Sequence, residues 1–293
     1  MRLLSIFLII VVNYNVENLF HPKHDSVAGE PKDDIEWTAD GERHWSYTRY
    51  YRKEENIARV LTNIGEWDGV DVVGLQEVEN ALCVKRLCYT LRQREYDFVH
   101  YESPDKRGID VALIYKKSRV DTIRTRPIQV DLGSQTTRDI LYVCARVDKR
   151  DTVHFFVCHL PSQRGGKAES EWKRNAAKEV LQHAVDSVFN LQVDAKIIVM
   201  GDMNSEDLEL KGLKDKRMNG EGTHKYQGRW TFLDHFYVSP AIDSLSQARV
   251  YDAEWIMEAD DKYLGLKPKR TYNGYHYQNG FSDHLPIVLH IDL

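Results

Sequence analysis

Short apolar runs alternate along the chain with stretches of helical periodicity. The runs are rich in β-branched residues, which favour strands, and several end abruptly at a polar residue. The predicted strands cover residues 3–15, 71–77, 96–101, 109–115, 140–147, 153–159, 197–200, 232–238 and 285–291. Apolar residues at helical spacing predict helices over residues 57–65, 80–93 and 168–189. Polar loops are expected over residues 21–48, 205–230 and 260–280.

This mixture of strands and helices is typical of an α/β protein. The chain has 293 residues, of which 42% are apolar, enough for a sizeable core. No linker, repeat or low-complexity tract divides the pattern. We therefore predict one domain over residues 1–293.

Charge and cysteine content limit the kinds of partner and of cross-link that we expect for this protein. The net charge is −5 and no run of five basic residues occurs, so a nucleic acid would have to be held by a local groove. Cys83, Cys88, Cys144 and Cys158 are too few and too scattered for a disulfide scaffold, and none stands in a C-x-x-C arrangement. We expect buried thiols.

The N-terminus allows two interpretations. Arg2 followed by the apolar run 3–12 resembles a secretory signal, but no small-residue cleavage site follows, and the run is too short to span a bilayer as a helix. Its β-branched residues 9–12 favour a first core strand, which we prefer. We expect a soluble protein without a membrane span, and leave a cytoplasmic or exported location open.

The most informative polar residues follow the apolar run 197–200. Gly201 ends the run, and Asp202 and Asn204 then stand two positions apart, which places both on one side of the chain if it stays extended. α/β proteins commonly place their chemistry at the carboxyl ends of strands. A lone Gly-Asp-x-Asn is also ordinary turn sequence, so its meaning depends on the other strand ends.

Oxygen-bearing side chains recur at those ends. They are Asn15, Glu77, Asp202, Asn204 and Asp283. A set without sulfur favours Mg²⁺, Mn²⁺ or Ca²⁺ over zinc. His159 and His284 lie beside predicted strands as well, where an imidazole could act as acid or base or stabilise charge. This combination suits phosphoester hydrolysis assisted by a metal ion.

Six short motifs in chain order resemble those of the endonuclease/exonuclease/phosphatase superfamily, which includes DNase I-like nucleases, neutral sphingomyelinases and inositol-polyphosphate phosphatases. They are residues 13–19 (NYNVENL), 75–78 (LQEV), 159–162 (HLPS), 201–204 (GDMN), 233–236 (LDHF) and 282–284 (SDH). Each is weak alone, but the ordered set covers nearly the whole chain. The resemblance implies a four-layer αββα sandwich, in which two mixed β-sheets pack face to face between helices.

The resemblance also implies a metal site. Glu77 would be the principal ligand, with Asn15 and Asp283 close by, and the cofactor would be Mg²⁺, or alternatively Mn²⁺ or Ca²⁺. As turn or surface residues these positions would carry no function, but their place within the ordered motifs favours the ligand roles.

Catalytic roles follow from the same resemblance. Asp202 would position or activate the attacking water, and Asn204 would hold the phosphate. His284 would contact the scissile phosphate, oriented by Asp234. His159 matches the second catalytic histidine of the superfamily.

The acidic partner of His159 is less determined. Glu102 is our candidate, with Asp105 and Asp110 as alternatives. His154 is out of phase with His159 on the same strand, so we expect it to face the other way. The remaining histidines that we assign to packing or the surface are His224, His235, His276 and His290.

Arginines could clamp phosphate oxygens. We favour Arg174 and Arg270 over Arg138 and Arg164, although each could equally be an ordinary surface residue.

Nucleic acid is the leading substrate class. Basic residues gather near the expected mouth of the site, at 106–107, 164–167, 173–174 and 262–270, and aromatic residues that could stack on bases are Trp230, Tyr263, Tyr272, Tyr275 and Tyr277. A phospholipid headgroup, as in sphingomyelinases, or a small phosphoester is the alternative. No amphipathic helix indicates membrane docking. We expect a monomer without an obligate protein partner.

Two readings without catalysis remain. The fold could serve as a binding module, but such a module would be expected to have lost part of the catalytic set, which is complete here. A structural Ca²⁺ site would leave both histidines unexplained, and no EF-hand loop is present.

Overall fold

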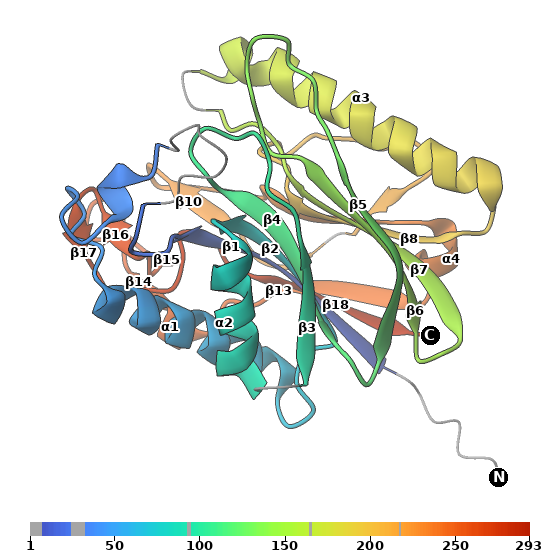
Figure 1. The fold of residues 1–293 in the computed structure, drawn as a ribbon, viewed down its shortest axis with the longest axis horizontal. Coiled ribbons are helices and arrows are strands. Elements are labelled where there is room, and N and C mark those ends of the chain that lie inside the picture. Colours follow the sequence, from blue (N-terminus) through green and yellow to red (C-terminus); the bar gives the residue numbers. More distant parts are fainter. Residues whose placement is uncertain (1–7, 25–32, 93–94, 164–165, 217) are drawn as a thin grey trace.

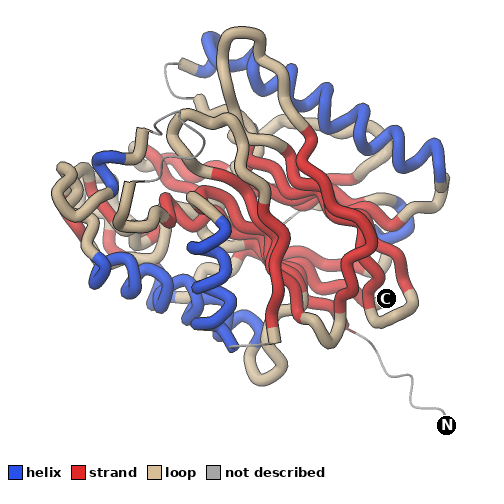
Figure 2. The backbone as a smooth tube through the Cα atoms, viewed as in Figure 1, coloured by secondary structure: helices blue, strands red, loops and turns tan. Residues whose placement is uncertain are grey.

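The protein is built from two β-sheets that pack face to face between helices (Figure 1, Figure 2). The computed structural model describes residues 8–24, 33–92, 95–163, 166–216 and 218–293. Each main sheet has six strands and contains both parallel and antiparallel pairs. The expected four-layer α/β sandwich is therefore confirmed.

The first sheet has the order β13-β18-β1-β2-β4-β3. Its strands are β1 (Leu8–Leu19), β2 (Val72–Val78), β3 (Tyr96–His100), β4 (Asp110–Lys116), β13 (Ser246–Val250) and β18 (Ile287–Asp292). Only β1 and β2 run parallel among its paired neighbours. Helices α1 (Tyr47–Gly65) and α2 (Ala81–Arg92) cover its outer face (Figure 1).

The second sheet has the order β5-β6-β7-β8-β12-β9. Its strands are β5 (Val120–Ile128), β6 (Ile140–Val147), β7 (Asp151–His159), β8 (Lys196–Asp202), β9 (Lys214–Asp215) and β12 (Asp234–Val238). Strands β7 and β8 run parallel. Helix α3 (Lys167–Leu191) lies along the outer face, on the opposite side of the molecule from α1 and α2 (Figure 1).

Short elements occupy much of the rest of the described chain, both within the segments that were expected to be loops and between residues 239 and 259. They are η1 (Ile35–Trp37), β10 (His224–Tyr226), β11 (Arg229–Thr231), α4 (Pro240–Asp243), η2 (Glu254–Ile256), β14 (Met257–Ala259), β15 (Leu266–Pro268), β16 (Tyr272–Asn273) and β17 (His276–Tyr277). Three pairs of these short strands form two-stranded hairpins. Among the described helices, none combines the length and apolar character needed to cross a membrane.

Alternating side chains divide the core into two layers. On β7, Phe155 and Val157 face the first sheet, whereas Phe156 and Cys158 pack under α3. The sheets approach closely at Gly74, where an added Cβ would lie 2.9 Å from the sulfur of Met200. All four cysteines are free and buried, as expected.

The predicted start of the first strand, over residues 3–7, lies outside the described residues, and β1 continues to Leu19, beyond the predicted end at residue 15. Other elements depart from the prediction as well. Helix α1 begins at Tyr47, ten residues before the predicted range, because Ser46 caps it and accepts a hydrogen bond from the Arg49 amide. Strands β5 and β13 were not predicted at all.

Candidate active site

Strand register brings three of the predicted site residues together. His159 ends β7 and Asp202 ends the parallel strand β8, and the two residues are paired in register. Asp234 begins β12, which runs antiparallel to β8, so it is paired with Asp202 from the other side. All three are buried. Three adjacent strands therefore present an imidazole and two carboxylates at one edge of the second sheet.

Two β-bulges shape the facing edge of the first sheet. The β1–β2 register shifts between Asn15 and Leu19, and the β2–β4 register shifts at Glu77. Glu17, Asn18 and Glu77 have φ values of 52°, 57° and 64°, in the left-handed region that non-glycine residues rarely adopt. The bulge at Asn18 directs its amide N–H at Glu77 Oε2, 3.0 Å away. Bulges next to functional sites commonly re-aim side chains in this way.

Asp202 lies at the centre of the site. Its Oδ2 accepts a hydrogen bond from Asn15 Nδ2 at 3.1 Å, which connects the two sheets. The same oxygen lies 3.6 Å from His159 Nε2 and 3.8 Å from His284 Nε2. Burial raises the pKa of Asp202 to about 7.

Asn204 reaches the site through a turn and not through an extended chain. It has a φ of 48°, and its amide N–H donates to Asp202 Oδ1 at 2.9 Å. Its Nδ2 donates to the Leu160 carbonyl at 3.0 Å. The expectation of an extended Asp202–Asn204 segment was wrong, because a side chain-to-backbone turn is more favourable at this corner.

His284 is held by Asp234. Its Nδ1 lies 2.8 Å from Asp234 Oδ2, so Nε2 points at Asp202. Burial opposes protonation, but the charges of Asp234 and Asp202 outweigh it and raise the pKa of His284 well above its usual value. Ser282 anchors this segment: its hydroxyl accepts from the His284 amide and donates to the Asn15 carbonyl.

His159 lies in the opposite electrostatic environment. Its Nε2 lies 3.9 Å from Glu77 Oε1 as well as near Asp202, and its buried Nδ1 has no hydrogen-bond partner among the described residues. Burial, followed by the positive charges of Arg138 and Arg107, lowers its pKa well below the usual value.

None of the expected acids orients His159. Glu102 lies beside His100, at 3.9 Å, whereas His159 Nδ1 has no hydrogen-bond partner among the described residues. Asp105 accepts from Arg138 at 3.0 Å, and Asp110 accepts from the Ser103 amide at 3.0 Å. Hydrogen bonds from Arg138 to the carbonyls of His159 and Leu160 hold this segment instead.

The predicted metal ligands offer oxygen only. Glu77 Oε1 lies 3.8 Å from Arg107 and 3.9 Å from His159, beyond hydrogen-bond distance, and is free to coordinate. Asp283 is paired with Arg270 at 2.7 Å; although burial opposes it, this charge lowers the pKa of Asp283 to about 2 and keeps the carboxylate ionised. Such a donor set fits a hard divalent cation. Asn15, Glu77 and Asp283 are the residues that could hold it.

Three functional candidates were missed by sequence reasoning. Glu17 is buried next to Asp283 and accepts from the Thr271 amide at 2.6 Å. Lys53 is buried on α1 and donates to Thr271 Oγ1 and the Phe281 carbonyl, both at 2.5 Å. The His224 ring packs on His284, with ring centroids 4.8 Å apart. Glu17 stands inside the motif 13–19, which could have indicated it, whereas His224 had been assigned to packing.

The arginines that were candidates for phosphate binding lie in different environments. Arg270 bridges Asp283 and Glu17 at the rim of the site. Arg174 is buried and donates to the Pro161 carbonyl and to Ser170 Oγ, so it supports the turn after His159. Arg164 lies outside the described residues.

Two basic pockets flank the site. The first, which we call the Arg107 pocket, has a volume of about 470 Å³ and includes Lys106, Arg107, Arg138 and Lys173 in its lining. The second, the Arg270 pocket, has a volume of about 360 Å³ and includes Lys225, Lys262, Lys267 and Arg270 together with Asp283 and Tyr263. Of the aromatic residues expected to stack on bases, Tyr272 is buried, whereas Tyr263 and Tyr275 are exposed.

Solved structures share this fold. TDP2 from C. elegans superposes with a TM-score of 0.62 at 15% sequence identity, covering 98% of this chain and 76% of that one. An endonuclease/exonuclease/phosphatase family protein from Bacteroides thetaiotaomicron gives 0.63 at 17% identity, covering 97% of both chains. A mannosyl-6-phosphatase from the same organism gives 0.59 at 17% identity, covering 96% of this chain and 98% of that one.

Sequence comparison gives the family. Curated protein sequences yield no match. The family model described as "Endonuclease/Exonuclease/phosphatase family" matches residues 10–293, which include every motif discussed above. The chain therefore belongs to the endonuclease/exonuclease/phosphatase family.

Proposed function

We propose that this protein is a Mg²⁺-dependent phosphodiester hydrolase that acts on nucleic acid. Phosphoester hydrolysis is the chemistry of its family. The observation that carries the proposal is the convergence of Asp202 with His284 and His159 opposite Glu77, since these residues come from both sheets. Unrelated surface acids and histidines would have no reason to meet in this way.

The metal would be held by Asn15, Glu77 and Asp283. When bound, a divalent cation supplies positive charge that offsets the charge of the phosphate oxygens. Glu77 is prepared for this role because the Asn18 amide fixes Oε2 and leaves Oε1 facing the cleft between the sheets.

His284 would stabilise the charge that develops on the phosphate. The Asp234 carboxylate at Nδ1 fixes the ring, so that the Nε2–H is directed into the site. Fixed donors directed at developing charge are commonly the largest single contribution to catalysis.

Asp202 would position the attacking water. Both of its oxygens are fixed, Oδ1 by the Asn204 amide and Oδ2 by Asn15, so the carboxylate has a single orientation. His159 Nε2, 3.6 Å from Asp202 Oδ2, would contact a phosphate oxygen. Asn204 would support the phosphate through the turn that also fixes Asp202.

The two flanking pockets support an extended polyanionic substrate. The Arg107 pocket and the Arg270 pocket lie on either side of the Glu77–Asp283 cluster, because Arg107 is close to Glu77 and Arg270 is bound to Asp283. A phosphodiester has a substituent on each side of the phosphorus, and a strand of nucleic acid places further phosphates in both directions. Exposed Tyr263 in the Arg270 pocket offers a stacking surface.

A small phosphoester is the second candidate. The Arg107 pocket alone, with a volume of about 470 Å³, is large enough for a sugar phosphate or a similar compact anion. Such a substrate would not require the Arg270 pocket.

The test is metal-dependent product release from a mixed panel. The panel contains plasmid, single-stranded DNA, RNA, sphingomyelin, an activated phosphodiester and a sugar phosphate. We expect nucleic-acid cleavage that EDTA abolishes and that falls by two orders of magnitude or more in His284→Ala. His154→Ala, which removes a histidine from the outer face of β7, serves as the matched control and should keep activity.

Turnover of His284→Ala at the wild-type rate would contradict the proposed site. Release from the sugar phosphate alone would replace nucleic acid with the second candidate.

A further inference from the structure

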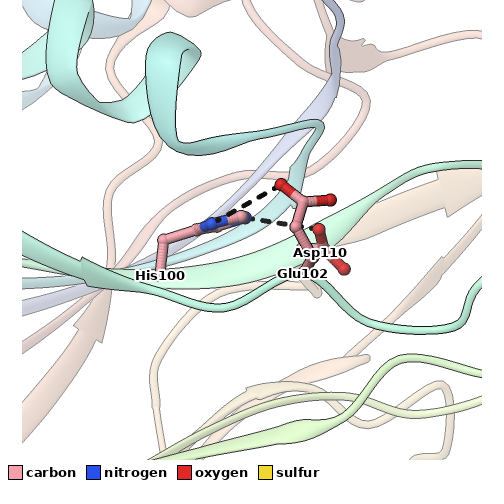
Figure 3. Close-up of side chains that lie close together, drawn as sticks. All are labelled: His100, Glu102 and Asp110. Carbon is pink, nitrogen blue, oxygen red and sulfur yellow. Dashed lines mark ion pairs between the residues drawn. The ribbon is translucent and has the colours of Figure 1, made fainter. Parts of the chain in front are cut away.

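A second cluster of side chains that could bind a metal lies at the end of β3, where Asp110 of β4 is paired with Val78, the residue after Glu77. It consists of His100 at the end of β3, Glu102 just beyond it, and Asp110 at the start of β4. One potential ligand atom from each residue lies within 4.8 Å of the others. Figure 3 shows the imidazole of His100 between the two carboxylates, with Glu102 beside Nδ1 and Asp110 beside Nε2.

The distance between the two buried residues of the cluster, His100 and Asp110, matches the distance between two ligands of one metal ion. His100 Nε2 lies 3.3 Å from Asp110 Oδ2, and their side chains are only 2% and 1% exposed. This separation is long for a hydrogen bond between a ring nitrogen and a carboxylate. Two ligands bound tetrahedrally at about 2.0–2.1 Å lie about 3.3–3.4 Å apart. The side chains are thus already separated as a bound ion would require.

Both facing atoms lack hydrogen-bond partners. Neither His100 Nε2 nor Asp110 Oδ2 is hydrogen-bonded to any described residue, although each is buried. Buried polar atoms in proteins are nearly always hydrogen-bonded, because leaving one without a partner costs free energy. Two such atoms facing each other indicate that a partner belongs between them.

Asp110 is held as a ligand would be held. Its other oxygen, Oδ1, accepts hydrogen bonds from the amide and the hydroxyl of Ser103. These bonds fix the carboxylate and leave Oδ2 directed at the imidazole. Metal-ligating carboxylates commonly have such supporting partners.

A further unpartnered carboxylate oxygen lies near the cluster. Asp139 precedes β6, is 7% exposed, and its Oδ1 has no hydrogen-bond partner within the described ranges. The charge of its carboxylate interacts with that of Asp110. A cation at the cluster would offset the concentration of negative charge.

We propose that His100, Glu102 and Asp110 form a zinc site that is distinct from the catalytic metal site. One imidazole nitrogen and two carboxylates are a donor set that zinc accepts, whereas Mg²⁺ prefers oxygen alone. Glu102 is partly exposed, so the ion enters from its side, and water completes the coordination.

The zinc ion would fasten the loop between β3 and β4. This loop carries Asp105, which binds Arg138, and Arg107, which reaches to 3.8 Å from Glu77. Both ends of the loop are bound to the same ion, because His100 and Glu102 precede it and Asp110 follows it. The site therefore has a structural role, in which it holds one wall of the Arg107 pocket.

The test measures metal content and not activity. The full chain is stripped with EDTA, incubated with excess Mg²⁺ and a small excess of ZnCl₂, passed through a desalting column and analysed by mass spectrometry for zinc. Wild type should retain about one zinc per chain, and His100→Gln and Asp110→Asn should each retain at least tenfold less. His154→Gln and Glu77→Gln are the matched controls and should retain zinc as wild type does.

Zinc-free wild type, or equal retention in all variants, would overturn the proposal. Loss of zinc in Glu77→Gln alone would also overturn it, because the ion would then belong to the catalytic cluster. If the His100 and Asp110 variants fail to fold, the visible absorption spectrum of the Co²⁺-loaded wild type replaces them as the test. The strong bands of tetrahedral Co²⁺ would support the site, whereas the spectrum of aqueous Co²⁺ would contradict it.

Discussion

Two histidines of the site differ in charge although they contact the same carboxylate. His284 has Asp234 and Asp202 as neighbours, whereas Arg138 and Arg107 lie near His159. Burial and these charges act together on His159 and keep it neutral, while carboxylates overcome burial at His284. Pairs of titratable groups whose environments push their pKa values apart commonly divide acid and base roles. The site therefore has one charged and one neutral imidazole on either side of Asp202.

Replacing Asp234 tests the orientation of His284. In Asp234→Asn the ring loses its charged partner, so its orientation and protonated form are no longer secured. We expect kcat to fall by about 10²–10⁴-fold, with a smaller change in KM. Steady-state kinetics on the preferred panel substrate measure this, and exposed Asp292→Asn is the control. An unchanged kcat would show that the Asp234–His284 contact is not needed for turnover.

Sequence alone could identify the residues at the ends of strands but not all of their neighbours. Asp202 and His284 stand in recognisable motifs beside apolar runs. Lys53 carries no such signal, because its partners Thr271 and Phe281 lie 218 and 228 residues away in the chain. The position of Glu102 beside His100 could not be predicted for a related reason, because the end of a strand fixes a residue's place along the strand but not which imidazole lies opposite it.

At the scale of elements, central strands were predictable and edge strands were not. Strand β5 exposes most of its side chains and contains Arg124, Arg126 and Pro127, so it has no strong apolar pattern. Strand β13 lies at the edge of the other sheet and is equally polar. The bulges at Glu17 and Glu77 were also invisible, because a periodic pattern predicts a regular strand.

Strand β8 requires glycine at position 201, where it is paired with Cys158 of β7. An added Cβ at Gly201, where φ is 156°, would lie 2.0 Å from the Cys158 carbonyl oxygen. We expect Gly201→Ala to lower the free energy of unfolding by about 3 kcal/mol or more, because a backbone atom must move. Gly133 has a φ of 70° with no atom within 4 Å, so Gly133→Ala should cost only about 1 kcal/mol. Urea unfolding measures both, and equal losses would contradict the clash.

An ion pair between buried His235 of β12 and half-exposed Asp215 of β9 makes stability depend on pH. His235 Nδ1 lies 3.2 Å from Asp215, and its Nε2 lies 3.1 Å from the Ser205 and Phe232 carbonyls, so acceptors surround both nitrogens. Burial lowers the pKa of His235, but Asp215 outweighs burial and raises it. The pair therefore stabilises the fold fully below the unfolded pKa, and this contribution is lost as pH rises through the higher folded value.

Asp215→Asn should remove that contribution. Because the Asp215 side chain is 40% exposed, we expect a loss of at most about 1 kcal/mol near pH 5.5, and a smaller loss near pH 9. Urea unfolding at the two pH values measures the difference. A loss that grows towards alkaline pH would contradict the assigned direction.

On the scale of the whole molecule, a net charge of −5 is combined with basic pockets at the site. Acidic residues dominate elsewhere, so a polyanion is attracted only near the cleft. This arrangement favours productive encounter over nonspecific adsorption.

Neutralising the Arg270 pocket should weaken binding of nucleic acid without altering the chemical step. We expect the double variant Lys262→Gln/Lys267→Gln to raise KM about tenfold, to leave kcat near wild type, and to reduce the slope of log KM against log salt by about 1.4 on single-stranded DNA. Kinetics on single-stranded DNA at several salt concentrations measure this. Lys85→Gln/Lys117→Gln, with exposed lysines outside both pockets, should change neither quantity. The same response in both double variants would remove the pocket from the substrate path.

The bulge at Glu77 sets stability and function against each other. Deleting this one residue would allow β2 and β4 to pair without interruption and would remove a left-handed backbone conformation. The sheet would therefore become more stable. The same deletion would remove the carboxylate that we propose as the principal metal ligand. Variants selected only for heat resistance will therefore tend to lose activity at this position, and a bulge retained in a very stable homologue would itself be a sign of continued catalysis.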